Sequence, residues 1–209
     1  MEMLIYLPIL FFSVILHEFA HGFTAYKYGD DTAYLMGRLT FNPMAHIDLV
    51  GTIAVPMFCY FANIPMFGWA KPVPVNFMRL HNPKADTAKV SFAGPMSNLF
   101  LVILAALILK TAVAANLSIG ILGSMLVYAI MINLILAIFN LIPLPPLDGS
   151  KILASFLPNR AAFKYMQLER YGMLLVIILL VSGIFSKIVM PIFNFVLRLI
   201  FAFIGVSYG

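Results

Sequence analysis

The chain has 209 residues, of which 63% are hydrophobic and only 10% charged, and its formal net charge is +5. Soluble proteins usually carry about 25% charged residues, so this composition indicates an integral membrane protein, long enough for one compact domain. The single cysteine, Cys59, excludes an internal disulfide and the cysteine-rich structural zinc motifs. The basic residues lie between apolar segments rather than in a patch interleaved with aromatic residues, which argues against a nucleic-acid partner.

Four apolar segments are long enough to span a bilayer, and we expect an all-α, polytopic transmembrane helix bundle. They lie at about residues 4–26, 87–109, 119–141 and 172–190. A fifth stretch, residues 191–206, is shorter and carries Arg198, so it either returns across the membrane or lies along its surface. No linker or internal repeat divides the chain. We therefore expect a single domain over residues 1–209, with a core at about 4–155 and a C-terminal transmembrane hairpin at about 171–206.

The first apolar segment carries His17, Glu18 and His21 in an HExxH pattern. On a helix, the two imidazoles are four residues apart and project from one face, where they can share a divalent metal. Glu18 is close enough to move a proton from metal-bound water without being a ligand itself. The alternative is a pair of histidines packed in a helix bundle. Ionisable groups are costly in lipid, so three of them so close together favour the metal site.

Residues 49–65 are also apolar, but glycine and proline interrupt them. If the N-terminus is outside and this segment enters the membrane and returns to the same side, ten of the 13 Lys and Arg are cytoplasmic. These ten are Lys27, Arg38, Lys71, Arg79, Lys84, Lys89, Lys151, Arg160, Lys164 and Arg170. A full crossing would place the basic residues between 71 and 89 outside, against the positive-inside tendency. We therefore expect a re-entrant segment.

Two segments are predicted to be extended, residues 37–43 and residues 67–76. In the second, Pro72 and Pro74 occupy alternate positions and favour an edge strand or an extended loop. Non-helical backbone at membrane depth is tolerated only where protein or a water-filled cavity covers it. A small membrane-associated β-sheet beside the metal site would meet that condition.

A catalytic zinc usually has three protein ligands and a water, so the histidine pair needs one more ligand. Asp148 is the strongest candidate among the eight acidic residues, because three prolines between residues 143 and 146 break the preceding helix and can turn this carboxylate inward. The alternative role of Asp148 is a helix N-cap or turn carboxylate at the membrane surface. Gly149 allows a close approach or an unusual dihedral angle next to it. In the re-entrant arrangement, the preceding helix ends on the same side as His21, which favours the ligand role.

The HExxH pattern, together with the sequence LDG at residues 147–149, resembles the site-2 protease family of intramembrane zinc metalloproteases. Further matches to that family are GRLTFNP at 37–43, HID at 46–48, GWAKPVPVN at 68–76 and GPMSN at 94–98. The resemblance extends from about residue 10 to residue 155. It implies one zinc ion per chain, bound by His17, His21 and Asp148, with Glu18 as the catalytic base. The sequence shows no PDZ-like or CBS-like insertion, so it resembles the compact members of the family.

Asn98 and Asn140 lie in apolar segments. The resemblance implies that they hold the substrate backbone or the developing oxyanion near the metal, where an amide donor stabilises charge that appears only in the transition state. Hydrogen bonding between helices is the alternative, and we expect that role for Asn133. His46 lies in a turn-rich segment without a helical partner, so we do not expect it to bind the metal.

Together, these residues predict a zinc metalloendopeptidase that hydrolyses peptide bonds within or near transmembrane segments of membrane proteins. Glu18 takes a proton from zinc-activated water and delivers it to the leaving amine. We expect a substrate to dock as an extended strand against residues 67–76 or 39–47. The alternatives are a membrane protein that binds or transports metal, and a non-catalytic scaffold that binds membrane segments.

The expected location is the cell membrane, with several crossings and the active site nearer the cytoplasmic side. The expected partners are the lipid bilayer and a transmembrane protein substrate. A homo-oligomer is left open by the sequence.

Overall fold

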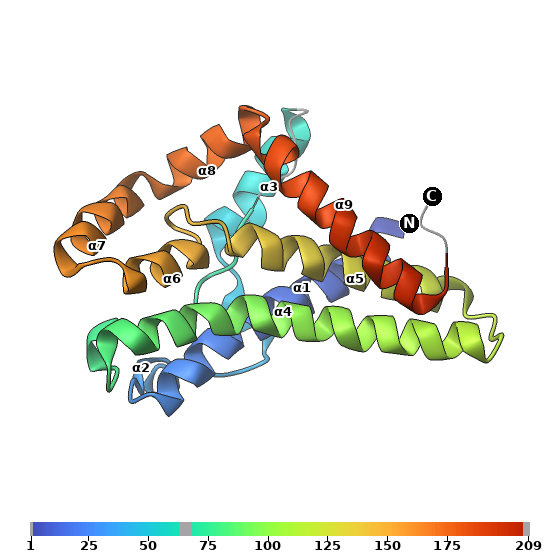
Figure 1. Cartoon of the computed structure of the whole chain (residues 1–209), viewed down its shortest axis with the longest axis horizontal. Coiled ribbons are helices and arrows are strands. Elements are labelled where there is room, and N and C mark those ends of the chain that lie inside the picture. Colours follow the sequence, from blue (N-terminus) through green and yellow to red (C-terminus); the bar gives the residue numbers. More distant parts are fainter. Residues whose placement is uncertain (1, 63–67, 207–209) are drawn as a thin grey trace.

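The computed structural model describes residues 2–62 and 68–206, which form helices joined by irregular segments. By length and composition, four of the described helices can cross a membrane. They are α1 (Glu2–Lys27), α4 (Pro83–Ala114), α5 (Gly120–Asn140) and α9 (Ile184–Ile204). The longest, α4, makes its most extensive contacts with α5 and α1 (Figure 1). The chain therefore has the architecture of a multi-pass membrane protein.

Shorter helices connect the long ones. They are α2 (Thr32–Leu35), a 3-10 turn η1 (Pro43–His46), a π-helix η2 (Leu49–Ala54), α3 (Val55–Phe61), a 3-10 turn η3 (Phe77–Arg79), α6 (Asp148–Phe156), α7 (Asn159–Met166), a 3-10 turn η4 (Gln167–Tyr171) and α8 (Gly172–Val181). Helices α2, α6 and α7 lie at the end of the bundle where α1 ends and α4 begins, opposite the chain termini (Figure 1). Many of the basic residues therefore lie at this end of the bundle.

Local sequence determines where α4 begins and ends. Pro83 occupies the first helical position, where its missing N–H costs nothing. The Asp86 carboxylate accepts a hydrogen bond from the Asn82 N–H at 2.8 Å, which satisfies a donor at the helix start. Beyond the last turn, Asn116 has a φ of 51°, a left-handed conformation that stops the helix.

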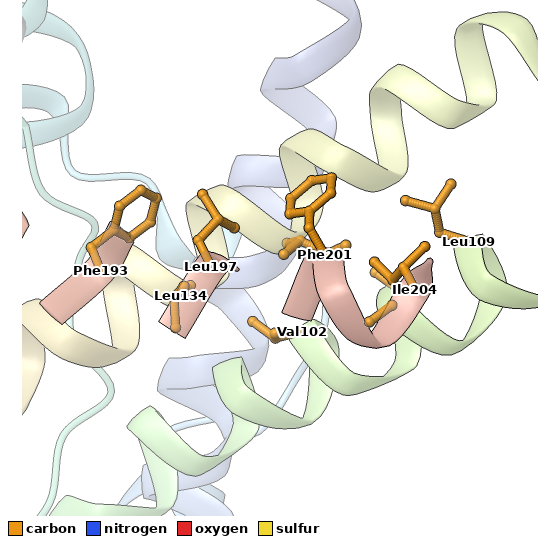
Figure 2. Packing of buried hydrophobic residues seen from close by; sticks show 10 residues of the cluster. Val102, Leu109, Leu134, Phe193, Leu197, Phe201 and Ile204 are labelled. Carbon is orange, nitrogen blue, oxygen red and sulfur yellow. The ribbon is translucent and has the colours of Figure 1, made fainter. Parts of the chain in front are cut away.

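The core lies between α4, α5 and α9. The cluster shown in Figure 2 includes Val102 and Leu109 of α4, Leu134 of α5, and Phe193, Leu197, Phe201 and Ile204 of α9. The four α9 residues are three or four positions apart, so they form one stripe along the helix. Ala105 and Ala106 of α4 are buried in the same cluster. Small side chains let helices approach closely, and close packing drives helix association in lipid.

The prediction of a small β-sheet is wrong for the described residues, which include no strand. Residues 68–76 are irregular, and their N–H groups make only two isolated backbone hydrogen bonds to described residues, from Trp69 N to the Gly51 carbonyl (3.1 Å) and from Lys71 N to the His46 carbonyl (2.9 Å). Prolines 72 and 74 leave one edge without donors, and on the other edge the Val73 N–H binds the Glu18 carboxylate instead of a neighbouring strand, so no ladder forms with the rest of the described chain. Residue 67 of the predicted segment lies outside the described residues.

The C-terminal helices divide at a different place from the one predicted. Helix α8 ends at Val181, and α9 begins at Ile184 and continues through Pro191. Gly183 between them has a φ of 74°, which favours glycine and ends the helix. The proline removes only one hydrogen bond from α9. Because the ten residues of α8 rise about 15 Å, half the bilayer core, the spanning helix of this pair is α9.

The segment predicted to be re-entrant is helical over residues 49–61. Helices η2 and α3 follow each other directly, and together they are shorter than each of the four long helices. Residues 63–65 lie outside the described residues. The re-entrant path stays a prediction.

Candidate metal centre

Three predicted ligands from two helices converge on one point. The Nε2 atoms of His17 and His21, both on α1, are 3.0 Å apart, and each lies 3.1 Å from Oδ2 of Asp148 at the start of α6. The three residues are 7%, 9% and 7% exposed. Among the described residues, this is the only group of three or more His, Cys, Asp or Glu side chains placed to hold a metal.

Hydrogen bonds on the far side of each imidazole fix where its hydrogen lies. His21 Nδ1 lies 2.7 Å from the Val90 carbonyl, which can only accept, so this nitrogen donates. His17 Nδ1 likewise donates to Asn98 Oδ1 at 2.6 Å. In the neutral imidazoles, both Nε2 atoms therefore carry a lone pair and no hydrogen. Two lone pairs and a carboxylate oxygen then face one another, and a metal ion between them would satisfy all three acceptors.

The arrangement fits zinc. Bonds of about 2.0–2.1 Å to nitrogen and oxygen place the ligands of a tetrahedral ion roughly 3.3 Å apart, close to the distances observed here. Two histidines with one carboxylate are typical of catalytic sites, which keep a fourth position for water. Gly94 of α4 packs directly over the pair, since a Cβ there would lie 2.4 Å from His21 Nε2 and 2.6 Å from His17 Nε2. The helix can approach the site this closely only with glycine at this position.

Asp148 reaches the histidines because the backbone before it is tightly packed. Leu147, not Asp148, is the N-cap of α6, and the Asp148 carboxylate contacts the imidazoles. A Cβ on Gly149 would lie 2.2 Å from the Leu141 carbonyl oxygen, so glycine permits the start of α6 to lie against the end of α5.

Asn98 lies behind the metal centre. Its amide accepts from His17 and donates to Asn133 Oδ1 at 2.8 Å, with a longer contact to the Ser13 carbonyl at 3.4 Å. Asn133 in turn donates to Ser13 Oγ at 2.9 Å. These residues are almost completely buried, and Asn98 lines neither of the cavities beside the metal centre. The geometry favours orientation of the His17 ring over contact with substrate, a role that the sequence interpretation missed.

Two cavities adjoin the metal centre. The polar cavity, of about 310 Å³, is lined by His21, Asp148, Lys151 and Glu169 among others. The apolar cavity, of about 230 Å³, is lined by Val14, Leu136, Phe139, Trp69, Met173 and Val176 among others. His17, Glu18 and Asn140 line both, so the cavities meet at the metal centre. The site is therefore reached from a polar side and from an apolar side.

Glu18 and Asn140 lie where the two cavities meet. Glu18 Oε2 accepts a hydrogen bond from the Val73 N–H at 2.8 Å, which holds the carboxylate in place. The Asn140 amide donates to the Leu136 carbonyl of its own helix at 3.0 Å. Both side chains are thus placed to contact a molecule bound in either cavity. His46 lies away from the centre, with Nε2 2.9 Å from the Thr40 carbonyl.

Sequence comparisons link the chain to known proteins. Residues 108–183 match the sequence model of "Peptidase family M50". The protein named "Putative zinc metalloprotease YwhC" of Bacillus subtilis is 39% identical over 191 residues, which cover 88% of this chain and 84% of that protein. "Putative zinc metalloprotease Rip2" of Mycolicibacterium smegmatis is 27% identical over 176 residues, or 84% of this chain and 66% of that protein. "Zinc metalloprotease MJ0392" of Methanocaldococcus jannaschii is 26% identical over 183 residues, or 85% and 42%. No solved structure is significantly similar to the chain.

Proposed function

Because the chain belongs to peptidase family M50, the site-2 protease family, and is a zinc metalloprotease, we propose that it hydrolyses peptide bonds within or next to transmembrane segments of membrane proteins. In this proposal, His17, His21 and Asp148 bind one zinc ion. The observation that carries it is the convergence of three acceptor atoms within 3.1 Å, two of them on a helix able to span the membrane.

Glu18 is the general base in the proposed reaction. Bound zinc supplies a water of lowered pKa and polarises the scissile carbonyl. The Val73 N–H occupies Oε2 of Glu18, which leaves Oε1 to take a proton from the attacking water and to return it to the leaving amine. Asn140, at the junction of the cavities, donates its amide hydrogens to the substrate main chain or to the developing oxyanion.

The two cavities indicate from which side the substrate enters the site and from which side water enters. The apolar cavity takes side chains from the membrane-embedded part of the substrate, since residues of α1, α5 and α8 line it. The polar cavity, with Lys151 and Glu169 in its wall, admits water. Lys151 belongs to α6, and α6 and α7 lie at the end of the bundle where α1 ends and α4 begins (Figure 1), the segments in which basic residues are concentrated. By the positive-inside tendency, that end faces the cytoplasm, and we place the protein in the cell membrane.

A substrate helix must unwind before its carbonyls can be attacked, and the non-helical residues 68–76 offer backbone groups with which an extended substrate can pair. Arg38 Nη2 holds this segment through the carbonyls of Lys71 (3.1 Å) and Pro72 (3.2 Å). Among the described residues, the Val75 N–H has no hydrogen-bond partner and is free to bind a peptide. Residues 43–46 instead form a closed 3-10 turn, which favours residues 68–76 as the docking edge.

Zinc content and cleavage of a transmembrane peptide, measured on detergent-purified protein, test the proposal. Glu18→Gln is expected to keep about one zinc per chain and to lose cleavage by at least ~100-fold, the range expected for general-base catalysis. His21→Ala is expected to lose both. His81→Ala changes an exposed histidine outside the cluster and should retain both. Cleavage by Glu18→Gln at the wild-type rate, or a wild type that holds zinc without cleaving, would contradict the proposal.

A further inference from the structure

Ser91 of α4 is a buried hydroxyl in the wall of the polar cavity that the proposed mechanism does not use. The residue is 1% exposed, and its Oγ has no hydrogen-bond partner among the described residues. A helical serine commonly bonds to a carbonyl three or four residues earlier. Ser13 does so with Ile9 and Ser97 with Gly94, both at 2.7 Å. Ser91 does not, so its hydroxyl keeps an unused hydrogen-bond donor in the cavity wall.

The neighbours of Ser91 place it close to the reacting groups. The Val90 carbonyl, one residue earlier, holds the His21 imidazole. Gly94, one helical turn later, packs over both histidines, and residues three apart lie on the same face of a helix. Ser91 therefore lies on the α4 face that is turned toward α1. It lines the same cavity as Asp148 and as Val75, the proposed docking position for substrate.

An extended peptide in this cavity has two hydrogen-bonding edges. One edge can pair with Val75, and the other needs partners of its own, because unpaired main-chain groups are costly where water is scarce. We propose that Ser91 binds this second edge, with its hydroxyl donating to a main-chain carbonyl of the substrate next to the scissile bond. The contact is independent of substrate side chains, and it rests on the proposed protease function.

Ser91→Ala and the matched variant Ser97→Ala test this contact. A neutral hydrogen bond corresponds to roughly a five- to tenfold change in an equilibrium. For Ser91→Ala we therefore expect kcat/KM to fall about five- to tenfold, with unchanged zinc content. Its melting temperature should be equal or higher, because an unpaired buried hydroxyl is removed. Ser97→Ala removes a hydroxyl bound within its own helix, and kcat/KM should stay close to that of the wild type. Ser91→Thr keeps the hydroxyl and should restore most of the activity.

Affinity for an uncleaved transmembrane peptide, measured in the Glu18→Gln background, separates this inference from the proposed function. There, adding Ser91→Ala should weaken peptide binding by about the same five- to tenfold factor. Unchanged peptide affinity would overturn the Ser91 contact while leaving the protease function intact. Loss of zinc along with activity would also overturn it, because Ser91 would then act on the metal centre. A wild type that binds the peptide but never cleaves it would instead refute the protease function.

Discussion

Removal of the Asn98 amide is expected to weaken zinc binding without contact between this residue and the metal. In Asn98→Ala, the His17 Nδ1–H loses its acceptor at 2.6 Å and the Asn133 Oδ1 loses its donor at 2.8 Å. Both groups are buried, so neither can turn to bulk water instead. The His17 ring is then free to rotate or to move its hydrogen to Nε2, and either change removes the lone pair directed at the metal.

Groups that orient a metal-binding histidine typically contribute 10–100-fold to metal affinity. For Asn98→Ala this corresponds to about 1.4–2.7 kcal/mol of binding free energy. Each buried polar group left unpaired also costs about 1–3 kcal/mol of folding stability. Asn98→Asp keeps an acceptor for His17 and should hold zinc with nearly wild-type affinity. It lacks the hydrogens that Asn133 accepts, so it should still lower the melting temperature.

Competition with a chromophoric zinc chelator, in detergent, measures the affinity directly. Asn194→Ala provides the matched control, because this asparagine is exposed on α9 and lies outside the network. Circular dichroism establishes that each variant is folded before its affinity is compared. A folded Asn98→Ala protein with wild-type zinc affinity would refute the reasoning, since it would show that His17 needs no partner behind it.

Two other substitutions test the packing around the centre. Gly94→Ala places a methyl group within 2.4 Å of His21 Nε2. We therefore expect loss of zinc, measured by metal analysis, and a lower melting temperature, measured by thermal unfolding. Normal zinc content would show that α4 can move away from the histidines. Val73→Pro removes the N–H that donates to Glu18 Oε2 at 2.8 Å. The kcat for a transmembrane peptide should therefore fall at least ~10-fold while zinc stays bound. An unchanged kcat would show that Glu18 does not need this hydrogen bond.

The membrane-spanning helices could be predicted from the sequence wherever the length of an apolar segment alone determines that it forms a spanning helix. The first three predicted segments each fall within, or within one residue of, the helices α1, α4 and α5. The C-terminal break could not be placed, because Pro191 is the stronger signal in sequence. The structure tolerates it inside α9 and turns instead at Gly183. The prediction of a sheet was wrong for a different reason. A strand needs a partner strand, and the sequence of one segment does not show whether a distant segment pairs with it.

The three metal-binding candidates could be predicted because their chemistry is local: a histidine pair on one helix face, and an aspartate after a broken helix. The role of Asn98 could not, because hydropathy does not tell which face of α4 meets α1. A signal was nevertheless present. Ser91, Gly94 and Asn98 follow an i, i+3, i+7 spacing, a stripe of small and polar residues in an apolar helix. That stripe is the face of α4 that the structure places against the histidines.

The hydrogen bonds behind His17 all run the same way, from donor to acceptor along the network, because the network ends at a backbone carbonyl that can only accept. The Ile9 carbonyl can only accept, so Ser13 Oγ donates to it and accepts from the Asn133 amide. The Asn133 oxygen must then face Asn98 Nδ2, which turns the Asn98 oxygen toward His17 Nδ1. This nitrogen therefore carries the hydrogen, and Nε2 presents a bare lone pair to the metal. Because the side chains of this network are buried, the Ile9 carbonyl, together with the Ala129 carbonyl that also accepts from the Asn133 amide, fixes the tautomer of a proposed metal ligand about two turns further along α1.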